Sequence, residues 1–156
     1  MRIVGIDPGS RVLGWGVIDA LYGSRFTHVA SGALRVASEG SLPARLLAIG
    51  SQLETILVTH KPEAVSIEDV FYAKNAQSAL TLGHARGVAI YVASRLGVPV
   101  FEYTALQIKQ AVTGAGRAEK DQVQHMIRLL LKLPNTSAMA LDTSDALAAA
   151  MCHAMR

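Results

Sequence analysis

Three apolar runs close together at the start of the chain place the strongest constraint on its fold. They cover about residues 2–7, 12–19 and 26–36, and short turn-rich pieces, PGSR and LYGSR, separate them. Connections this short join antiparallel neighbours, because parallel strands need a crossover of a dozen or more residues. The first 36 residues are therefore predicted to form an antiparallel meander of three strands.

The hydrophobic period changes after the third run. Over residues 42–60 apolar side chains recur at three- and four-residue spacing, which predicts a helix. Two short β-rich runs, 64–69 and 98–103, then alternate with predicted helices, which are 76–96, 105–113, 119–133 and 142–155. This order predicts an α/β fold with a five-stranded mixed sheet flanked by helices on both faces. It resembles the ribonuclease H-like fold, in which the first strand lies centrally and ends in an acid.

Length and composition fit one soluble domain spanning residues 1–156. There is no internal repeat or linker, and the single cysteine, Cys152, excludes an intrachain disulfide and favours a reducing compartment. Charge and turn residues come too early for a signal peptide, and His84, Arg86 and Arg95 interrupt the longest apolar stretch. We therefore expect a cytoplasmic protein with no membrane contact. The net charge of +3 mildly favours a polyanionic partner.

Four acids stand where a core would not need them. Asp7 ends the first strand, Glu68 ends the buried run AVSIED, and Asp142 and Asp145 lie three apart at the start of an Ala-rich helix, so these two share a face. If the first and fourth strands are neighbours, Asp7 and Glu68 lie side by side. Clustered carboxylates raise one another's pKa, and a divalent cation such as Mg²⁺ removes that cost. Two such ions can activate water for phosphodiester hydrolysis.

Each acid also has a purely structural explanation. Asp7 precedes Pro-Gly and is a good turn residue, and Gly9 would permit that turn. Asp142 fits a helix N-cap and Asp145 a first-turn acid favoured by the helix dipole. Glu68 is the hardest to explain in this way, because a buried strand end rarely carries an unpartnered acid. On spacing alone both interpretations stay open.

Four longer segments carry more specific motifs. They are GIDPGSRVLGWGVID, IEDVFYAKNAQSALTLGHARGVAI, VFEYTALQIKQAVTGAGRAEKDQVQHMIRLLLKL and DTSDALAAAMCHA. In this order and spacing they resemble the RuvC family of bacterial Holliday-junction resolvases, over nearly the whole chain. The resemblance implies a homodimer that binds a four-way DNA junction and nicks two strands of like polarity symmetrically, during homologous recombination and DNA repair. It also implies work with a branch-migration helicase complex of RuvA and RuvB type proteins.

The resemblance also implies roles for individual residues. The family's catalytic, metal-binding acids fall on Asp7, Glu68, Asp142 and Asp145. The expected cofactor is Mg²⁺, two ions per site, with Mn²⁺ as a substitute. Asp7 is then best explained as a metal ligand, and the neighbouring Gly5, Gly9 and Gly14 would let backbone or phosphate approach closely.

DNA-binding residues are expected in two places. Lys109 and Lys120 match family positions associated with DNA binding and cleavage, and Arg117 lies between them in the sequence. Together with the four-residue repeat in the predicted helix 119–133, they would form a ridge that contacts phosphates. The alternative is an ordinary solvated helix face. The members of that repeat are Lys120, Gln124, Arg128 and Lys132.

The segment VFYAKN, directly after Glu68, is the second place. Phe71 matches a family aromatic that stacks on unpaired bases, and Tyr72 and Lys74 are weaker candidates for DNA contact. The alternative is that the aromatic rings fold back onto the helix that follows. That helix, 76–96, carries Gly83 and Gly87 and is the predicted isologous contact of a C₂ dimer, which suits a nearly two-fold junction.

The sequence leaves three other functions as alternatives. A ribonuclease H-like nuclease for RNA or hybrids would use the same acids, and a junction-binding protein without catalysis would not need them. An actin-like kinase is indicated only by the first segment, and such enzymes close two domains over a nucleotide, whereas this chain has room for one. The five histidines form no ligand-spaced cluster, which argues against zinc.

Overall fold

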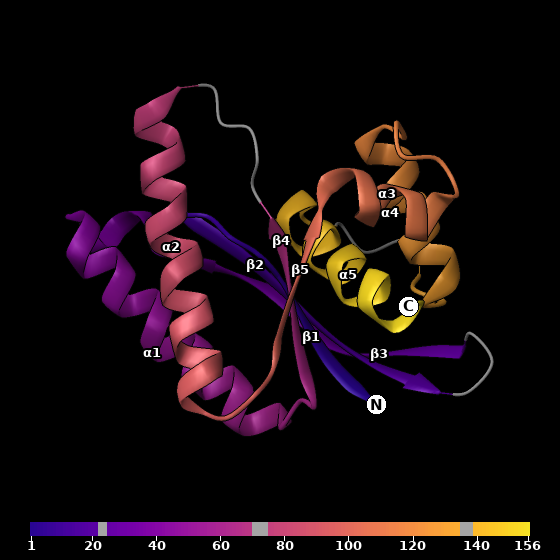
Figure 1. The fold of residues 1–156 in the computed structure, drawn as a ribbon, viewed down its shortest axis with the longest axis horizontal. Coiled ribbons are helices and arrows are strands. Elements are labelled where there is room, and N and C mark those ends of the chain that lie inside the picture. Colours follow the sequence, from indigo (N-terminus) through magenta and orange to yellow (C-terminus); the bar gives the residue numbers. More distant parts are fainter. Residues whose placement is uncertain (22–24, 70–74, 135–138) are drawn as a thin grey trace.

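The central feature of the fold is one five-stranded sheet. A computed structural model describes residues 1–21, 25–69, 75–134 and 139–156. The strands are β1 (Arg2–Asp7), β2 (Val12–Leu21), β3 (Arg25–Arg35), β4 (Ala64–Asp69) and β5 (Val100–Thr104), in the order β3-β2-β1-β4-β5. The first three form the predicted antiparallel meander, and β4 and β5 add in parallel. β1 is therefore central, as predicted (Figure 1).

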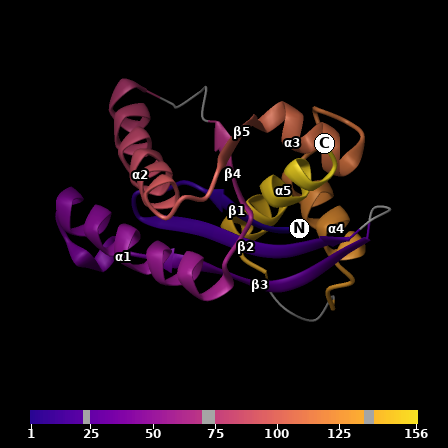
Figure 2. The same ribbon diagram turned by 60° about the horizontal axis from the view of Figure 1, so that its bottom comes forward.

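Helices cover both faces of the sheet, which confirms the predicted architecture. A short 3₁₀ turn, Ala37–Glu39, leads into α1 (Leu42–His60), which packs with α2 (Ala76–Arg95) on one face. The other face carries α3 (Ala105–Thr113), α4 (Lys120–Leu130) and α5 (Leu141–Ala154), as Figures 1 and 2 show. None of the described helices is long and apolar enough to cross a membrane.

Helix α4 is shorter than its predicted range of 119–133. The helix ends at Leu130, and Lys132 two residues later has a positive φ of 53°. A residue in this left-handed region stops the helical hydrogen-bond ladder. The apolar period continues to Leu133 because Leu131 and Leu133 still contact the core after the helix has ended. Periodicity alone therefore placed the end of this helix too late.

Side-chain alternation determines which layer each strand residue faces. In β1, Val4 and Ile6 belong to the core under α1 and α2, whereas Ile3 belongs to the core under α3, α4 and α5. Because successive strand side chains point to opposite faces, Asp7 has the same orientation as Ile3. The same count in β4 places Glu68 with Ala64, on the side of α5. Both acids therefore lie on one side of the sheet.

Helix α5 lies unusually close to β1 and β2. A β-carbon at Gly5 would overlap the main-chain carbonyl oxygen of Ala146. Ser66 of β4 donates a buried hydrogen bond of 2.7 Å to the carbonyl oxygen of Ala149. Most of the Ala-rich helix is buried as a result. The glycine and the small alanine side chains let the backbones approach, and this approach brings the start of α5 to the end of β1.

Candidate active site

A cavity of about 290 Å³ opens at the carboxyl ends of β1 and β4. Three predicted acids, Asp7, Glu68 and Asp145, line it. The predicted basic residues Lys109 and Lys120 line it as well. Its apolar wall comes from helices on both layers, through Leu82, Ile108, Val123 and Ala148. Residues that are distant in the sequence therefore surround one space.

Asp7 is the most perturbed acid of this group. It follows Ile6 at the end of the central strand and pairs with Gly14 of β2. Burial, followed by the charges of Asp145, Glu68 and Asp142, raises its pKa to about 8, and Lys120 acts in the opposite direction. A carboxyl group whose pKa is raised this far is typical of a functional site, because only a nearby cation stabilises its charged form.

Glu68 lies beside Asp7 across the parallel strand pair. The last recorded pair of that ladder is Ile6 with Ile67, and Glu68 is the next residue of β4. Burial and the charge of Asp145 raise its pKa, and Lys120 and Lys109 lower it. The predicted adjacency of the first and fourth strands is confirmed.

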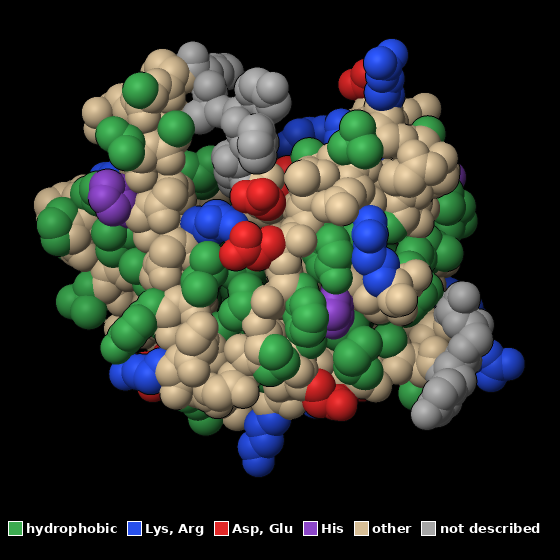
Figure 3. Space-filling view, viewed as in Figure 1, with side chains coloured by type: hydrophobic (Ala, Val, Ile, Leu, Met, Phe, Trp, Pro, Cys, Tyr) green, Lys and Arg blue, Asp and Glu red, His purple; other side chains and the backbone are tan. Residues whose placement is uncertain are grey.

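The neighbouring acid, Asp69, points to the opposite side of the sheet. It lies 3.4 Å from the guanidinium group of Arg86 on α2, which also pairs with Glu102 of β5. Figure 3 shows acidic side chains next to a basic one between α2 and β5. Of the two acids at this strand end, only Glu68 therefore lines the cavity.

The two aspartates of α5 occupy different positions. The Asp145 carboxylate accepts a hydrogen bond of 2.9 Å from Lys120 Nζ. Asp142 is half-buried and is not part of the cavity lining, but its charge contributes to the raised pKa of Asp7. The charges of the other three predicted acids therefore all act on Asp7, although Asp142 does not line the cavity as the other acids do.

The predicted basic residues separate into two groups. Lys109 on α3 and Lys120 at the start of α4 face the acids, and the hydrogen bond to Asp145 raises the pKa of Lys120. Arg117 is exposed in the connection between these helices and does not line the cavity. Phe71, Tyr72 and Lys74 lie outside the described residues.

Two further members of the four-residue repeat, Gln124 and Arg128, bond to the chain that follows α4. Gln124 donates a hydrogen bond of 3.0 Å to the carbonyl oxygen of Met139. Arg128 donates one of 2.8 Å to the carbonyl oxygen of Pro134. Lys132 lies beyond the end of the helix. The four-residue repeat therefore does not continue as a straight row of basic side chains.

The chemistry of the acids fits a hard cation. Within the described ranges, no three Asp, Glu, His or Cys side chains lie close enough together to form a ready-made metal cage. Around the cavity, however, the candidate ligands are all carboxylates, which Mg²⁺ and Mn²⁺ prefer over nitrogen or sulfur donors. Mg²⁺ usually binds one or two carboxylates and keeps several waters. The upward pKa shifts of Asp7 and Glu68 are the electrostatic sign of carboxylates that need positive charge nearby.

Sequence reasoning missed the apolar part of the cavity wall. In this wall Leu82 lies on α2 and Val123 on α4. The hydrophobic period of a helix does not show that its apolar face ends at a cavity instead of continuing into the core, because that depends on where the helix stops over the sheet.

Comparisons with known proteins agree with this geometry. A family model described as crossover junction endodeoxyribonuclease RuvC matches residues 3–153. The crossover junction endodeoxyribonuclease RuvC of Citrifermentans bemidjiense is 55% identical over 154 residues, which cover 99% of this chain and 92% of that protein. That of Geotalea uraniireducens is 53% identical, with 99% and 88% covered. The structure of T. thermophilus RuvC in complex with a Holliday junction substrate superposes with a TM-score of 0.92 at 32% identity, covering 99% of this chain and 93% of that one.

The fold and the acid-lined cavity place this protein in the class of ribonuclease H-like nucleases. Within that class, the chain belongs to the crossover junction endodeoxyribonuclease RuvC family.

Proposed function

We propose that this protein is a cytoplasmic, divalent-metal-dependent endonuclease that resolves Holliday junctions during homologous recombination and DNA repair. It makes paired, symmetric nicks in strands of like polarity. The observation that carries the proposal is the cavity in which Asp7, Glu68 and Asp145 meet from three separate elements, in a chain of this family. The relative solved with its Holliday junction substrate supports the choice of DNA structure. Residues 1–156 act as one nuclease domain.

In this proposal Asp7, Glu68, Asp142 and Asp145 are the catalytic acids and the metal ligands. They would hold two Mg²⁺ ions, for which Mn²⁺ can substitute, and the bound metal supplies an activated water and stabilises the leaving oxygen. The half-buried carboxylates of Asp7 and Glu68 would fix the position of that charge, because both stand at the ends of sheet strands. Asp145 adds a carboxylate to this cavity from the first turns of α5.

Lys109 and Lys120 would bind the phosphates next to the scissile bond. Both reach the same cavity as the acids, so that their ammonium groups offset the negative charge that DNA brings to the carboxylates. Arg117, exposed nearby, would contact a more distant phosphate. Phe71, Tyr72 and Lys74 are proposed contacts at the junction centre, with Phe71 stacking on unpaired bases.

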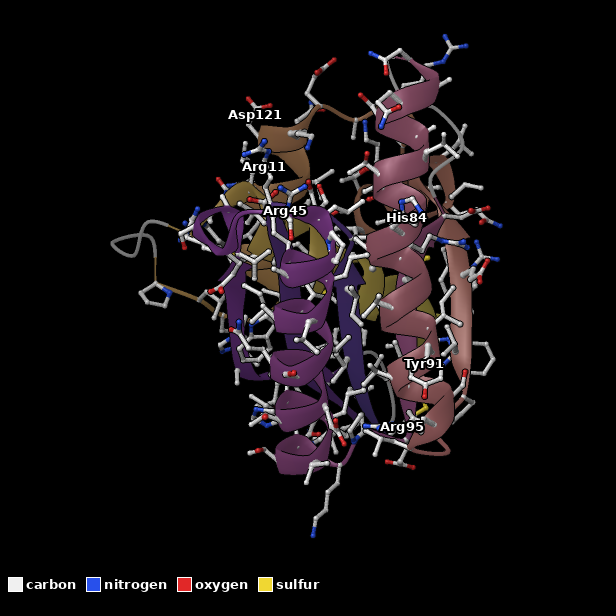
Figure 4. The ribbon with its side chains drawn as sticks, turned by 90° about the vertical axis from the view of Figure 1, so that its left-hand side faces the viewer. Arg11, Arg45, His84, Tyr91, Arg95 and Asp121 are labelled. Atoms are coloured by element: carbon white, nitrogen blue, oxygen red, sulfur yellow. The ribbon has the colours of Figure 1, made fainter. Side chains whose placement is uncertain are left out.

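A homodimer is part of the proposal, because a C₂ dimer matches two symmetric nicks in a nearly two-fold junction. One face of α2 offers the isologous contact. Leu80 and Tyr91 are 62% and 63% exposed, and Gly83 and Gly87 lie between them with open space around each. Figure 4 shows Tyr91 and His84 along the outer side of this helix. A branch-migration helicase complex of RuvA and RuvB type proteins is the proposed further partner.

The test is cleavage of a synthetic immobile four-way junction. Equal amounts of junction, linear duplex and RNA–DNA hybrid are incubated with the protein, with and without Mg²⁺, and nicks are scored strand by strand. We expect Mg²⁺-dependent, symmetric nicks in the junction only. Preferential cleavage of the hybrid would instead identify a general ribonuclease H-like nuclease.

Asp7→Asn provides the matched control, because it keeps the size of the side chain and removes its charge. The variant should lose nicking and keep junction binding in EDTA. If the unmodified protein binds the junction but shows no metal-dependent nicking, it is a junction-binding protein without catalysis.

A further inference from the structure

A second groove lies beside the acid-lined cavity. Its volume is about 440 Å³, and it runs between the β1–β2 turn, the start of α1 and the first turns of α2. Among the residues that the structure describes, no acidic side chain lines it. The polar residues that line it are Ser10, Arg11, Arg45, Gln77, Ser78 and Thr81. We call it the Arg11 groove.

The two arginines of this groove differ in how they are held. Arg45 donates from Nε to the carbonyl oxygen of Ser10 at 3.0 Å and from Nη1 to that of Gly40 at 2.8 Å. It therefore fixes the turn that follows Asp7. Arg11 is exposed, and its guanidinium group has no ion pair within the described residues, unlike those of Arg2 and Arg95. Figure 4 shows Arg11 and Arg45 next to each other.

The Arg11 groove adjoins the acid-lined cavity. Leu82 lines both spaces. Arg11 follows Asp7 by four residues, so their Cα atoms are at most about 14 Å apart, at roughly 3.5 Å per residue of extended chain. Phosphates of one DNA strand repeat about every 3.4 Å along the helix axis. A strand whose scissile phosphate lies at Asp7 can therefore reach Arg11 within a few nucleotides.

The chemistry of the Arg11 groove matches a phosphate. Guanidinium groups pair with phosphate oxygens in a fork geometry, and hydroxyl and amide side chains add neutral donors. An exposed cation without an acidic partner loses no ion pair when it takes up such a ligand. The polar lining is a poor match for an apolar ligand.

We propose that the Arg11 groove binds a backbone phosphate of the DNA strand that is cut, a few nucleotides from the scissile bond. Arg11 makes the contact, and Arg45 holds the turn that presents it. This inference rests on the proposed function, because it takes DNA as the substrate. It adds a phosphate contact outside the cavity, on the side of the sheet that α1 and α2 cover.

The first test measures the salt dependence of junction binding in EDTA, where no cleavage occurs. Each lost phosphate contact lowers the slope of log K against log salt by about 0.9 for duplex DNA. Arg11→Gln should show this loss and bind several-fold more weakly at low salt. Arg11→Lys keeps the cation and should keep the slope. Arg25→Gln is the control, since it removes the same charge from an exposed residue at the other end of β2 and β3.

The second test locates the phosphate. Single methylphosphonates replace successive phosphates on either side of the scissile bond, and affinities are measured for the unmodified protein, Arg11→Gln and Arg25→Gln. At one position within about four nucleotides of the scissile bond, the methylphosphonate should weaken binding by the unmodified protein and by Arg25→Gln. The same methylphosphonate should cause no further loss of affinity in Arg11→Gln, because the side chain that contacts this phosphate is already absent. Additive losses at every position would overturn the inference.

The outcomes separate the inference from the function on which it rests. If the unmodified protein fails to bind junctions, both are wrong. If it binds and nicks junctions while Arg11→Gln and Arg25→Gln have the same slope and affinity, the function stands and the Arg11 groove is not a phosphate site.

Discussion

Gly14 lies directly against the main chain of Asp142, because a β-carbon at Gly14 would overlap the carbonyl oxygen of Asp142. Gly14 is also the residue that pairs with Asp7 across the β1–β2 ladder. The strand pair that carries Asp7 is therefore the surface on which the first turn of α5 rests. Because Gly14 has no side chain, the start of α5 can lie close to this strand pair, and this sets the distance from Asp7 to Asp142 and Asp145.

Gly14→Ala should therefore disturb the active site more than the addition of one methyl group usually does. The backbone of α5 would have to shift, and overpacking of this kind typically costs about 1–3 kcal/mol. We expect a loss of unfolding free energy in urea of that order, together with strongly reduced junction nicking. Gly50→Ala is the control, since the nearest atom there is a side-chain methyl of Val88 at 3.3 Å. Full nicking activity in Gly14→Ala would show that the height of α5 does not matter.

Asp7 should make the metal-free protein less stable as the pH rises. Its pKa is about 8 in the folded protein and about 3.9 in an unfolded chain, so between these values the folded state binds the extra proton. The unfolding free energy should then fall as the pH rises from 5 to 8. Asp7→Asn should remove most of this dependence. Urea titrations in EDTA at pH 5, 6.5 and 8 measure the difference, and parallel curves for the two proteins would contradict the prediction.

Mg²⁺ should stabilise the folded protein through the same carboxylates. At a free concentration ten times its Kd, a ligand that binds only the folded state adds about 1.4 kcal/mol. Thermal unfolding should therefore shift upward with Mg²⁺ in the unmodified protein and much less in Asp7→Asn or Glu68→Gln. Asp121→Asn removes an exposed acid that does not line the cavity and should respond normally. An equal shift in all four proteins would place the binding site elsewhere.

Lys120 should matter more for cleavage than for binding. Its ammonium group bonds to Asp145 and counteracts the raised pKa of both Asp7 and Glu68. Lys120→Gln should lower the single-turnover nicking rate by on the order of 10²-fold, as for other lost electrostatic contacts at reacting groups. Junction affinity in EDTA should change only a few-fold. Lys132→Gln, an exposed position beyond α4, should nick at the normal rate.

The outer face of α2 should control the oligomeric state. Gly87 has open space around its Cα, so Gly87→Glu leaves the folded monomer intact and places a charge in the proposed isologous contact. We expect a monomer by light scattering at micromolar concentration, and a loss of paired nicking. Leu47→Glu changes a residue that is 72% exposed on α1 and should leave the dimer unchanged. If the unmodified protein itself is a monomer under these conditions, the proposed dimer is wrong.

Much of this architecture follows from local patterns in the sequence. Short turns give the meander, the change of period gives the helices, and two-residue alternation along β1 and β4 places Asp7 and Glu68 on one side of the sheet. These features depend on residues that are close together in the chain, so they can be predicted from the sequence. The same is true of the three-residue spacing of Asp142 and Asp145.

Only the tertiary structure decided how far apart these groups are and which of them meet. The contact of Lys120 with Asp145, the diversion of Gln124 and Arg128 to the segment after α4, and the Arg11 groove all join residues from separate elements. Such contacts depend on where each helix ends and how closely it packs, as at Gly5 and Gly14. Periodicity repeats identically whether a helix lies one ångström higher or lower, whereas hydrogen bonds and charge interactions do not.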